Sequence, residues 1–292
     1  MKISPDTTRI GFIGLGVMGR SMAGHILDKG YELHVYTRTE STAGDLLDRG
    51  AVWAESPAAL AQAVDLVITI VGYPSDVEGV WLGDQGILAH LAHGSMAIDM
   101  TTSDPALAEK LFATGAERGI AVLDAPVSGG DLGAQNATLS IMVGGEEDDF
   151  HRTRPIFEAM GKNIVLQGKA GAGQHTKMAN QIAIAAGMVA MCESLSYAKK
   201  AGLDPDTVLA SIGQGAAGSW SLNNLGPRII KGDYSPGFFV KHFIKDMGIA
   251  LASARSMGLD TPGLDLAHSL YEKLAAQGGE DLGTQALYQL FA

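Results

Sequence analysis

The stretch TRIGFIGLGVMGRSMA, residues 8–23, decides the fold of the amino-terminal half of this chain. Its segment Arg9–Ile13 predicts a β-strand, and Ser21–Lys29 has the composition of a helix. A glycine directly after that helix, Gly30, is a usual helix stop. The stretch therefore predicts a strand, a tight glycine-rich turn and a helix in immediate succession.

The glycines of this turn are spaced as G-x-G-x-x-G, at Gly14, Gly16 and Gly19. The first permits the tight turn, the second lets a pyrophosphate approach the backbone, and the third lets the helix pack close to the strand. Amide groups at the helix N-terminus then face the anion. We expect the dinucleotide-binding loop to comprise Gly14, Leu15, Gly16, Val17, Met18 and Gly19. The alternative is a glycine-rich turn with a structural role alone.

The rest of the first half alternates between β-rich runs and helix-like segments. The expected strands are Arg9–Ile13, Glu32–Tyr36, Asp65–Val71, Ser95–Asp99, Ala121–Asp124, Leu139–Val143 and Asn163–Leu166. The expected helices include Ser21–Lys29, Thr42–Arg49 and Pro105–Arg118. This alternation predicts an α/β fold: a Rossmann-like, doubly wound and mostly parallel sheet with helices on both faces.

After about Gly168 the pattern becomes helical throughout. The expected helices are Thr176–Ala201, Pro205–Gly213, Leu222–Ile230, His242–Gly258 and Leu264–Gln277. The first is long enough to span a domain at 1.5 Å per residue. We therefore expect a dinucleotide-binding domain over residues 1–168, and an all-α substrate and oligomerisation domain over residues 169–292 that begins with a long interdomain helix.

Composition excludes several classes of function. The 292 residues carry a formal charge of −11, which argues against nucleic-acid binding. Cys192 is the one cysteine, so an intramolecular disulfide and a multi-cysteine metal site are excluded, and the His spacing supports no zinc site. Uninterrupted apolar runs are too short to cross a bilayer, and residues 1–8 lack a signal-peptide pattern. We expect a cytoplasmic protein with neither a metal nor a membrane partner.

Residues after the second expected strand indicate the cofactor. An NAD-preferring site usually carries Asp or Glu there to hold the ribose 2′-hydroxyl. This chain instead has Thr37, Arg38 and Thr39, and a guanidinium flanked by hydroxyls suits a 2′-phosphate. We predict NADP(H) as the preferred cofactor; if Arg38 is a solvated loop cation, NAD(H) is accepted. We expect the turns at other strand ends, one with Tyr73 and Pro74 and one with Thr102, to line the same crevice; the alternative is an ordinary turn or helix cap at each.

Two further segments carry chemistry. Ser128, Gly129 and Gly130 follow the fifth strand and offer a hydroxyl and backbone amides suited to a carboxylate, although an ordinary loop explains them equally. Lys177, Asn180 and Gln181 share one face of the long helix. Apolar surroundings lower the pKa of a lysine by desolvation, which suits proton exchange near neutral pH. The alternative is a solvated surface lysine.

The chain as a whole resembles the β-hydroxyacid dehydrogenase family. Five motifs in the family order carry the resemblance: GFIGLGVMG (11–19), IDMTTSDP (98–105), DAPVSGG (124–130), GAGQHTKMANQ (171–181) and PGFFVKHFIKD (236–246). The resemblance implies Lys177 as general acid/base and residues 128–130 as the substrate-carboxylate site. It also implies that Asn180 and Gln181 orient the substrate, that Thr102 and Lys245 contact the cofactor, and that Asp246 lies beside the site.

The resemblance therefore implies an oxidoreductase that moves a hydride between a nicotinamide and a short β-hydroxy acid or semialdehyde acid. Trp220, Phe238 and Phe239 either wall the pocket or pack in the core, and His175 is a packing or surface residue. The alternatives are an imine reductase-like enzyme, a class that usually lacks this lysine, and a non-catalytic dinucleotide-binding module. The apolar face of the long helix and the resemblance imply a homodimer or homotetramer.

Overall fold

The computed structural model describes residues 3–292, which form two compact units. The first unit covers Met1–Lys177 and the second covers Met178–Ala292. The division falls within a long helix, α9 (Ala172–Lys200), whose first residues belong to the first unit. The boundary expected between residues 168 and 169 lies just before this helix. Each unit has its own hydrophobic core.

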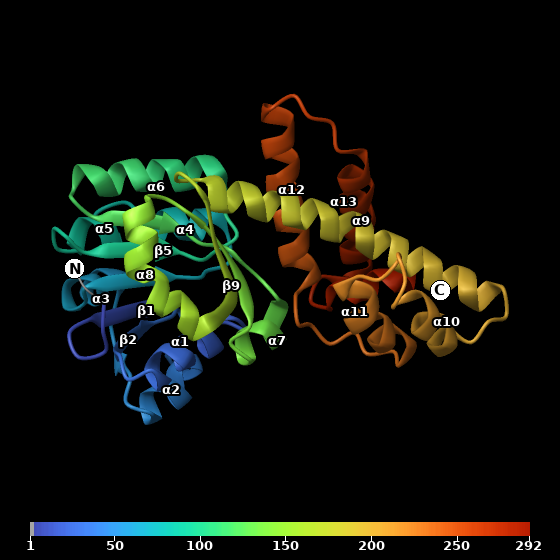
Figure 1. Ribbon diagram of the computed structural model, residues 1–292, viewed down its shortest axis with the longest axis horizontal. Helices are drawn as coiled ribbons and strands as arrows, with labels where there is room; N and C mark the ends of the chain where they lie inside the picture. Colours follow the sequence, from blue (N-terminus) through green and yellow to red (C-terminus); the bar gives the residue numbers. More distant parts are fainter. Residues whose placement is uncertain (1–2) are drawn as a thin grey trace. The chain divides into compact units, whose positions relative to one another are not determined.

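The first unit is built on a nine-stranded sheet in the order β3-β2-β1-β4-β5-β6-β8-β7, with β9 also paired to β8 (Figure 1). Pairing is parallel from β3 to β6, antiparallel for β6 with β8 and β7 with β8, and parallel for β8 with β9. The strands are β1 (Arg9–Ile13), β2 (Glu32–Tyr36), β3 (Val52–Trp53), β4 (Leu66–Thr69), β5 (Met96–Asp99), β6 (Ala121–Asp124), β7 (Val127–Ser128), β8 (Leu139–Gly144) and β9 (Gly161–Gly168). The strand order reverses at β1, next to β4, and ligands bind at such a switch point in parallel sheets.

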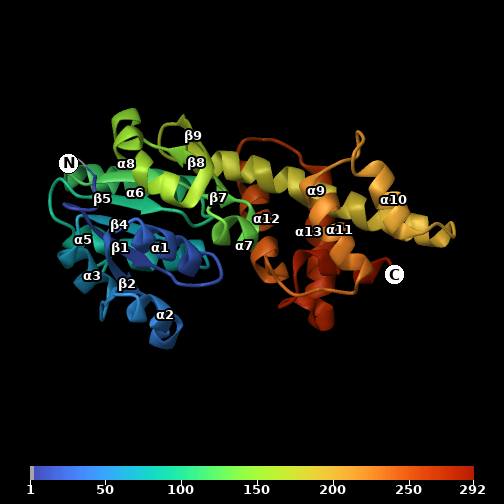
Figure 2. The same ribbon diagram turned by 60° about the horizontal axis from the view of Figure 1, so that its bottom comes forward.

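Helices cover both faces of this sheet, as Figures 1 and 2 show. They are α1 (Gly19–Asp28), η1 (Glu40–Ala43), α2 (Gly44–Asp48), α3 (Pro57–Ala63), α4 (Pro74–Trp81), α5 (Ile87–His90), α6 (Pro105–Glu117), α7 (Gly130–Gln135) and α8 (Glu147–Met160). Successive strand residues point to opposite faces, so Ile10 and Phe12 belong to one core cluster and Ile13 to the other. The doubly wound α/β architecture expected from the alternation is confirmed.

The glycine-rich turn sets how closely α1 approaches the sheet. Gly14 adopts a φ of +99°, and a Cβ there would lie 2.0 Å from the carbonyl oxygen of Ile70. A Cβ on Gly19 would lie 1.9 Å from the carbonyl oxygen of Gly14. No side chain fits at either position, because the helix starts directly against the strand ends.

Two buried carboxylates occupy neighbouring strand ends. Asp99 on β5 and Asp124 on β6 are register partners, and each is 3% exposed. Asp99 Oδ1 accepts hydrogen bonds from Thr69 Oγ1 (2.8 Å) and from the amide of Thr101 (3.1 Å). Burial raises the pKa of Asp99 to about 6, against the lowering effect of these hydrogen bonds. The carboxylate therefore orders the turn after β5 at the cost of a buried charge.

The second unit is helical, as expected. After α9 come α10 (Pro205–Ile212), α11 (Trp220–Ile230), α12 (Val240–Ser256), α13 (Pro262–Leu274), η2 (Ala275–Gly279) and η3 (Thr284–Leu290). Its core gathers Met188 and Cys192 of α9 with Phe243 of α12 and Tyr271 of α13. The Phe243 and Tyr271 rings lie edge to face, with centroids 5.1 Å apart, so α12 and α13 pack through aromatic contact.

The sequence analysis found no apolar run long enough to cross a bilayer, but one helix of the structure meets a less strict criterion. Among residues 3–292, α9 is long and apolar enough to cross a membrane by length and composition, with a mean hydropathy of 1.2 over its most apolar window. The expectation had rested on uninterrupted apolar runs, which this helix lacks. Of this apolar part of α9, 44% is buried inside the protein. Its residues Met188 and Cys192 belong to the core of the second unit. A central helix of a globular domain passes the same test.

Several elements escaped the sequence patterns. The strands β3 and β7 have two residues each, too few to show a period, and α3, α4, α5 and α7 are short. Helix α8 contains Pro155, which is unfavourable inside a helix, although the three acidic residues of its first turn favour one. In the fold it nonetheless buries Phe150, Ile156 and Phe157 against the sheet. Packing, rather than local propensity, stabilises this helix.

We predict that Gly19→Ala lowers the free energy of unfolding by about 1–3 kcal/mol, because the new methyl group overlaps the Gly14 carbonyl oxygen and α1 must move away from β1. Gly79→Ala is the matched control, because a Cβ on this glycine of α4 meets nothing within 4 Å. Urea denaturation of both variants measures the difference. Equal stabilities would contradict the close approach at Gly19.

A second prediction concerns pH. Because the pKa of Asp99 is raised in the folded protein, its contribution to the free energy of unfolding is largest below pH 4 and is lost as pH rises through about 6. The loss amounts to about 3 kcal/mol. Asp99→Asn keeps an acceptor oxygen for Thr69 and Thr101 but carries no charge, so this part of the pH dependence should disappear. Urea denaturation between pH 4 and 7 tests this; identical slopes for variant and wild type would refute it.

Candidate functional site

The turn from β1 to α1 fits a pyrophosphate. Met18 precedes α1 without a side-chain cap, and the first turn of this helix has no acidic residue. A Cβ on Gly16 would meet nothing within 4 Å, so the backbone there is open to a ligand. The leading amides of α1 and the open side of Gly16 together form a site where a phosphate group can be held by backbone donors.

Arg38 lies just beyond the end of β2, between Thr37 and Thr39. Its side chain is 85% exposed, and Nη1 lies 3.7 Å from Asp76 Oδ1. Asp76 also accepts a hydrogen bond from the backbone amide of Tyr73 (3.1 Å), in the turn that begins α4. The ion pair shows that the turn after β2 lies beside the turn after β4. The residues on these neighbouring turns of the first unit are Thr37, Arg38, Thr39, Tyr73 and Pro74.

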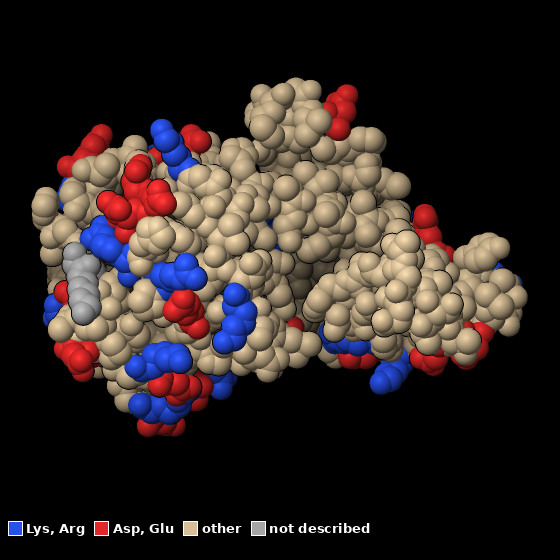
Figure 3. Space-filling model, viewed as in Figure 1, with Lys and Arg blue, Asp and Glu red and all other residues tan. Residues whose placement is uncertain are grey.

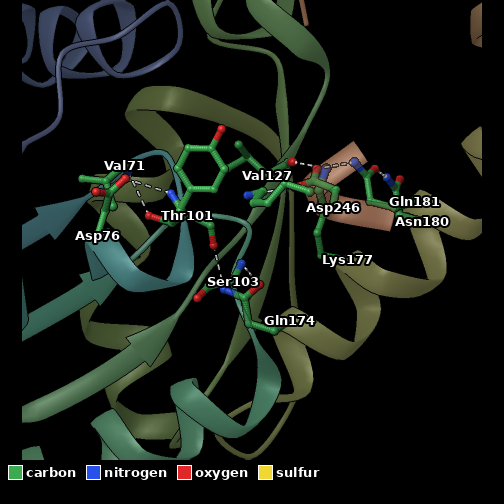
Figure 4. A network of polar contacts seen from close by, with 12 residues as sticks. Val71, Asp76, Thr101, Ser103, Val127, Gln174, Lys177, Asn180, Gln181 and Asp246 are labelled. Carbon is green, nitrogen blue, oxygen red and sulfur yellow. Dashed lines mark hydrogen bonds and ion pairs between the residues drawn. The ribbon is translucent and has the colours of Figure 1, made fainter. Parts of the chain in front are cut away.

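The turn after β5 is tied to its neighbours on both sides. Thr101 Oγ1 accepts a hydrogen bond from the amide of Val71 (3.0 Å), which holds the turn to the end of β4 (Figure 4). Ser103 and Asp104 lead into α6, where the Asp104 side chain caps the amide of Ala106 at 2.7 Å. Thr102 lies between these fixed points and is partly exposed.

Gln174 was missed by the sequence patterns, although it holds this turn in place. Its side chain is fully buried; Oε1 accepts from the amide of Ser103 (2.9 Å), and Nε2 donates to the carbonyl of Thr101 (2.7 Å). Figure 4 shows Gln174 beneath the turn. Gln174 lies on α9 three residues before Lys177. The same helix therefore holds the turn after β5 by hydrogen bonds and carries the lysine. Its place inside the motif GAGQHTKMANQ was the available signal, but a glutamine does not by itself indicate chemistry.

Asp124 fixes the start of α9. Its Oδ1 accepts from the amide of Gly171 and its Oδ2 from the amide of Gln174, both at 2.8 Å. Burial raises the pKa of this carboxyl, and the backbone donors oppose the rise. A carboxylate at a helix N-terminus is also stabilised by the helix dipole. The first turn of α9 is thereby attached to the carboxyl end of β6.

Lys177 is buried, with 7% of its surface exposed. Its Nζ donates a hydrogen bond to the carbonyl oxygen of Val127 at 2.8 Å, which Figure 4 also shows. Val127 immediately precedes Ser128, Gly129 and Gly130, all partly exposed. The predicted amine and the predicted carboxylate site therefore lie together within the first unit. The expected loop here differs in detail: Ser128 ends β7, Gly130 begins α7, and both glycines have positive φ.

The remaining predicted polar residues belong to the second unit. Asn180 Nδ2 donates to Gln181 Oε1 (2.8 Å), and Gln181 Nε2 donates to Asp246 Oδ2 (2.6 Å). Lys245 Nζ lies 2.9 Å from Asp246 Oδ1, an ion pair rather than an aligned hydrogen bond. Gln181 is 1% exposed and Asp246 is 2% exposed, whereas Asn180 is partly exposed. These four side chains form one hydrogen-bonded and ionic chain between α9 and α12.

The aromatic residues considered as pocket walls have different environments. Phe238 packs against Phe243 in the core of the second unit, with ring centroids 5.6 Å apart. Phe239 precedes α12 and contacts His242 edge to face. Trp220 begins α11 and is 54% exposed. His175 is exposed, which agrees with its interpretation as a surface residue.

Both halves of the chain match known families. Residues 9–168 match the NAD binding domain of 6-phosphogluconate dehydrogenase. Residues 171–291 match the family described as the NAD-binding domain of NADP-dependent 3-hydroxyisobutyrate dehydrogenase. The two matches together cover nearly the whole chain and meet just before α9.

Individual relatives match over almost their full length. An uncharacterized oxidoreductase of Bacillus subtilis, YkwC, is 58% identical over 97% of this chain and 98% of its own. The 2-hydroxy-3-oxopropionate reductase of Escherichia coli is 40% identical over 96% of each chain. The structure of Mycobacterium tuberculosis 3-hydroxyisobutyrate dehydrogenase with L-serine superposes with a TM-score of 0.88 at 30% identity, over 97% of this chain and 98% of that one. The chain belongs to the β-hydroxyacid dehydrogenase family and is an NAD(P)-dependent oxidoreductase.

Proposed function

We propose that this enzyme transfers a hydride between NADP(H) and a short β-hydroxy acid or the corresponding semialdehyde acid, with Lys177 as general acid/base. The observation that carries the proposal is the position of the Lys177 amine. It is buried and lies 2.8 Å from the carbonyl oxygen of Val127, directly before Ser128. A solvated surface lysine would instead keep its amine in water.

The first unit supplies the anchoring groups. Ser128 offers a hydroxyl, and the backbone amides of residues 128–130 can hold a substrate carboxylate. A carboxylate bound there places the β-carbon of a short substrate near the Lys177 amine, because both groups adjoin Val127. The positive φ values of Gly129 and Gly130 suit a backbone that turns its amides toward a ligand.

Lys177 would move the proton. In the reductive direction its ammonium donates a proton to the carbonyl oxygen of the semialdehyde, and in oxidation the neutral amine removes the proton of the β-hydroxyl. A bound nicotinamide supplies or accepts the hydride. The Val127 carbonyl oxygen accepts a hydrogen bond from Nζ and so holds the amine beside residues 128–130. Thr102, on the turn held by Gln174, and Lys245 would contact the cofactor.

The preference for NADP(H) over NAD(H) is part of the proposal. Arg38 is exposed just beyond β2, between two threonines, where a ribose 2′-phosphate would lie. Its long ion pair with Asp76, at 3.7 Å, is weak and can give way to a phosphate, which offers bidentate acceptors. The description of the second matched family as NADP-dependent supports the same preference.

A homodimer or homotetramer in the cytoplasm, with neither nucleic acid nor membrane as partner, completes the proposal. The second unit exposes large apolar side chains, among them Tyr197 (75%), Met257 (62%) and Leu266 (53%). Figure 3 shows few charged side chains over α9, α12 and α13 on the face that it draws. Exposed apolar side chains with few charges between them support self-association.

We predict that Lys177→Met lowers kcat by about 10²–10⁴-fold, the usual contribution of a general acid/base, while the affinity for NADPH stays the same. Lys199→Met is the matched control, because it removes an exposed lysine from the last turn of the same helix. Initial rates of NADPH oxidation with 2-hydroxy-3-oxopropionate, together with fluorescence titration of NADPH, measure both quantities. Turnover close to that of wild type in Lys177→Met would remove this residue from the proposed role.

The cofactor preference can be tested separately. Arg38→Ala should weaken NADPH binding about 10–100-fold and leave NADH binding nearly unchanged, because only NADPH carries the 2′-phosphate. Arg154→Ala, which removes an exposed, paired arginine on α8, controls for the change in net charge. Kd values of both cofactors for the three proteins give the result. A parallel loss for NADH and NADPH would count against 2′-phosphate recognition by Arg38.

A further inference from the structure

The first turn of α4 holds a carboxylate beside Arg38. Asp76 is the third residue of this helix, and its Oδ2 accepts a hydrogen bond from the backbone amide of Tyr73 at 3.1 Å. An acid at this position caps the helix, and the positive end of the helix dipole stabilises its charge. Because the cap uses Oδ2, Oδ1 is left to face Arg38, whose Nη1 lies 3.7 Å away.

Helix α4 is itself held before its first turn and at its last residue. The amide of Val71, in the turn that leads into α4, donates a hydrogen bond to Thr101 Oγ1 at 3.0 Å. Trp81, the last residue of α4, is fully buried, and its Nε1 donates to Thr69 Oγ1 at 3.0 Å. The Asp76 carboxylate is therefore fixed by its own cap and by the attachment of the helix that carries it.

Arg38 is the partner in this ion pair that can move. Its side chain is 85% exposed, against 29% for Asp76. In the described part of the chain, residues 3–292, the Arg38 guanidinium makes no hydrogen bond, and Asp76 is the acid with which it pairs. A guanidinium binds best to an anion that offers two oxygens at hydrogen-bond distance, and Asp76 does not do so at 3.7 Å. Arg38 can therefore leave the fixed carboxylate for a phosphate.

We propose that Asp76 is a specificity-determining residue for the cofactor, because its carboxylate competes with the ribose 2′-phosphate of NADP(H) for Arg38. Binding of NADP(H) separates Arg38 from Asp76 and places a second negative charge near the carboxylate. NAD(H) carries a hydroxyl at this position and leaves the ion pair intact. Asp76 therefore lowers the affinity for NADP(H) alone. This inference rests on the proposed function, in which Arg38 binds the 2′-phosphate.

The expected preference for NADP(H) is thus smaller than Arg38 by itself would give. An NAD-preferring site usually carries its acid at the end of the second strand. In this chain the acid comes from the turn after β4 and acts on the arginine. Exposed ion pairs are weak and are screened by salt, so removal of the Asp76 charge should change the Kd of NADPH by about three- to tenfold at low salt.

The test compares wild type with Asp76→Asn by fluorescence titration of NADPH and of NADH at an ionic strength of about 20 mM. Asparagine keeps an oxygen that accepts from the Tyr73 amide but carries no charge, so α4 stays capped. The Kd of NADPH should fall about three- to tenfold, and the Kd of NADH should stay within about twofold. In about 0.5 M salt the gain for NADPH should shrink.

Glu78→Gln is the matched control, because it removes the same charge from α4 at a carboxylate that pairs with Lys110 of α6 at 2.7 Å. Both Kd values should stay near those of wild type. Asp76→Glu keeps the charge and the capping group, so it should also resemble wild type. In an Arg38→Ala background, Asp76→Asn should improve NADPH binding by less than about twofold, because the guanidinium for which the two anions compete is absent.

Two fragments of the cofactor restrict the test to its adenosine half. Adenosine 2′,5′-bisphosphate and adenosine 5′-monophosphate differ in the 2′-phosphate, and both are measured as competitors of NADPH binding. Asp76→Asn should tighten binding of the bisphosphate by the same factor as NADPH and leave the monophosphate unchanged. Asp76→Gln, which also caps through an amide oxygen, replaces Asp76→Asn if that variant does not fold.

The possible failures are distinguishable. An unchanged Kd of NADPH in Asp76→Asn, an equal change for NADH, or an equal gain in Glu78→Gln would overturn the competition, provided that Arg38→Ala still weakens NADPH binding. If Arg38→Ala leaves NADPH binding unchanged, the proposed recognition of the 2′-phosphate is itself wrong.

Discussion

The two hydrogen bonds that Asp124 accepts from the amides of Gly171 and Gln174 hold the rest of the site in place. They attach the first turn of α9 to the end of β6, although about fifty residues separate the partners along the chain. The positions of the side chains that follow in the helix depend on this attachment. Gln174 can then reach the turn after β5, and Lys177 can reach the carbonyl of Val127.

Burying a polar group costs desolvation free energy, and the first unit buries several polar side chains at one edge of its sheet. Asp99, Asp124, Gln174 and Lys177 are each less than a tenth exposed, and each makes at least one hydrogen bond. Partners with good geometry offset much of the desolvation cost. The benefit is rigidity, because the turns that would meet a cofactor and a substrate are tied to strand ends instead of moving as free loops.

The second unit uses the same principle with a different result. The hydrogen bonds from Asn180 to Gln181 and from Gln181 to Asp246 join α9 to α12 and fix how both amides are turned. Such control is invisible in the motif GAGQHTKMANQ, because Asp246 lies 65 residues further along the chain.

The sequence by itself determined the doubly wound fold of the first half, the helical second half, the glycine-rich turn and the identity of the family, because these depend on local period, spacing and motif order. It also singled out Lys177 and residues 128–130. The contacts among these residues, and those of Gln174 and Gln181, were decided only by the tertiary structure. A glutamine or a helix such as α8 has no distinctive local pattern, and its role follows from partners that folding brings near from distant parts of the chain.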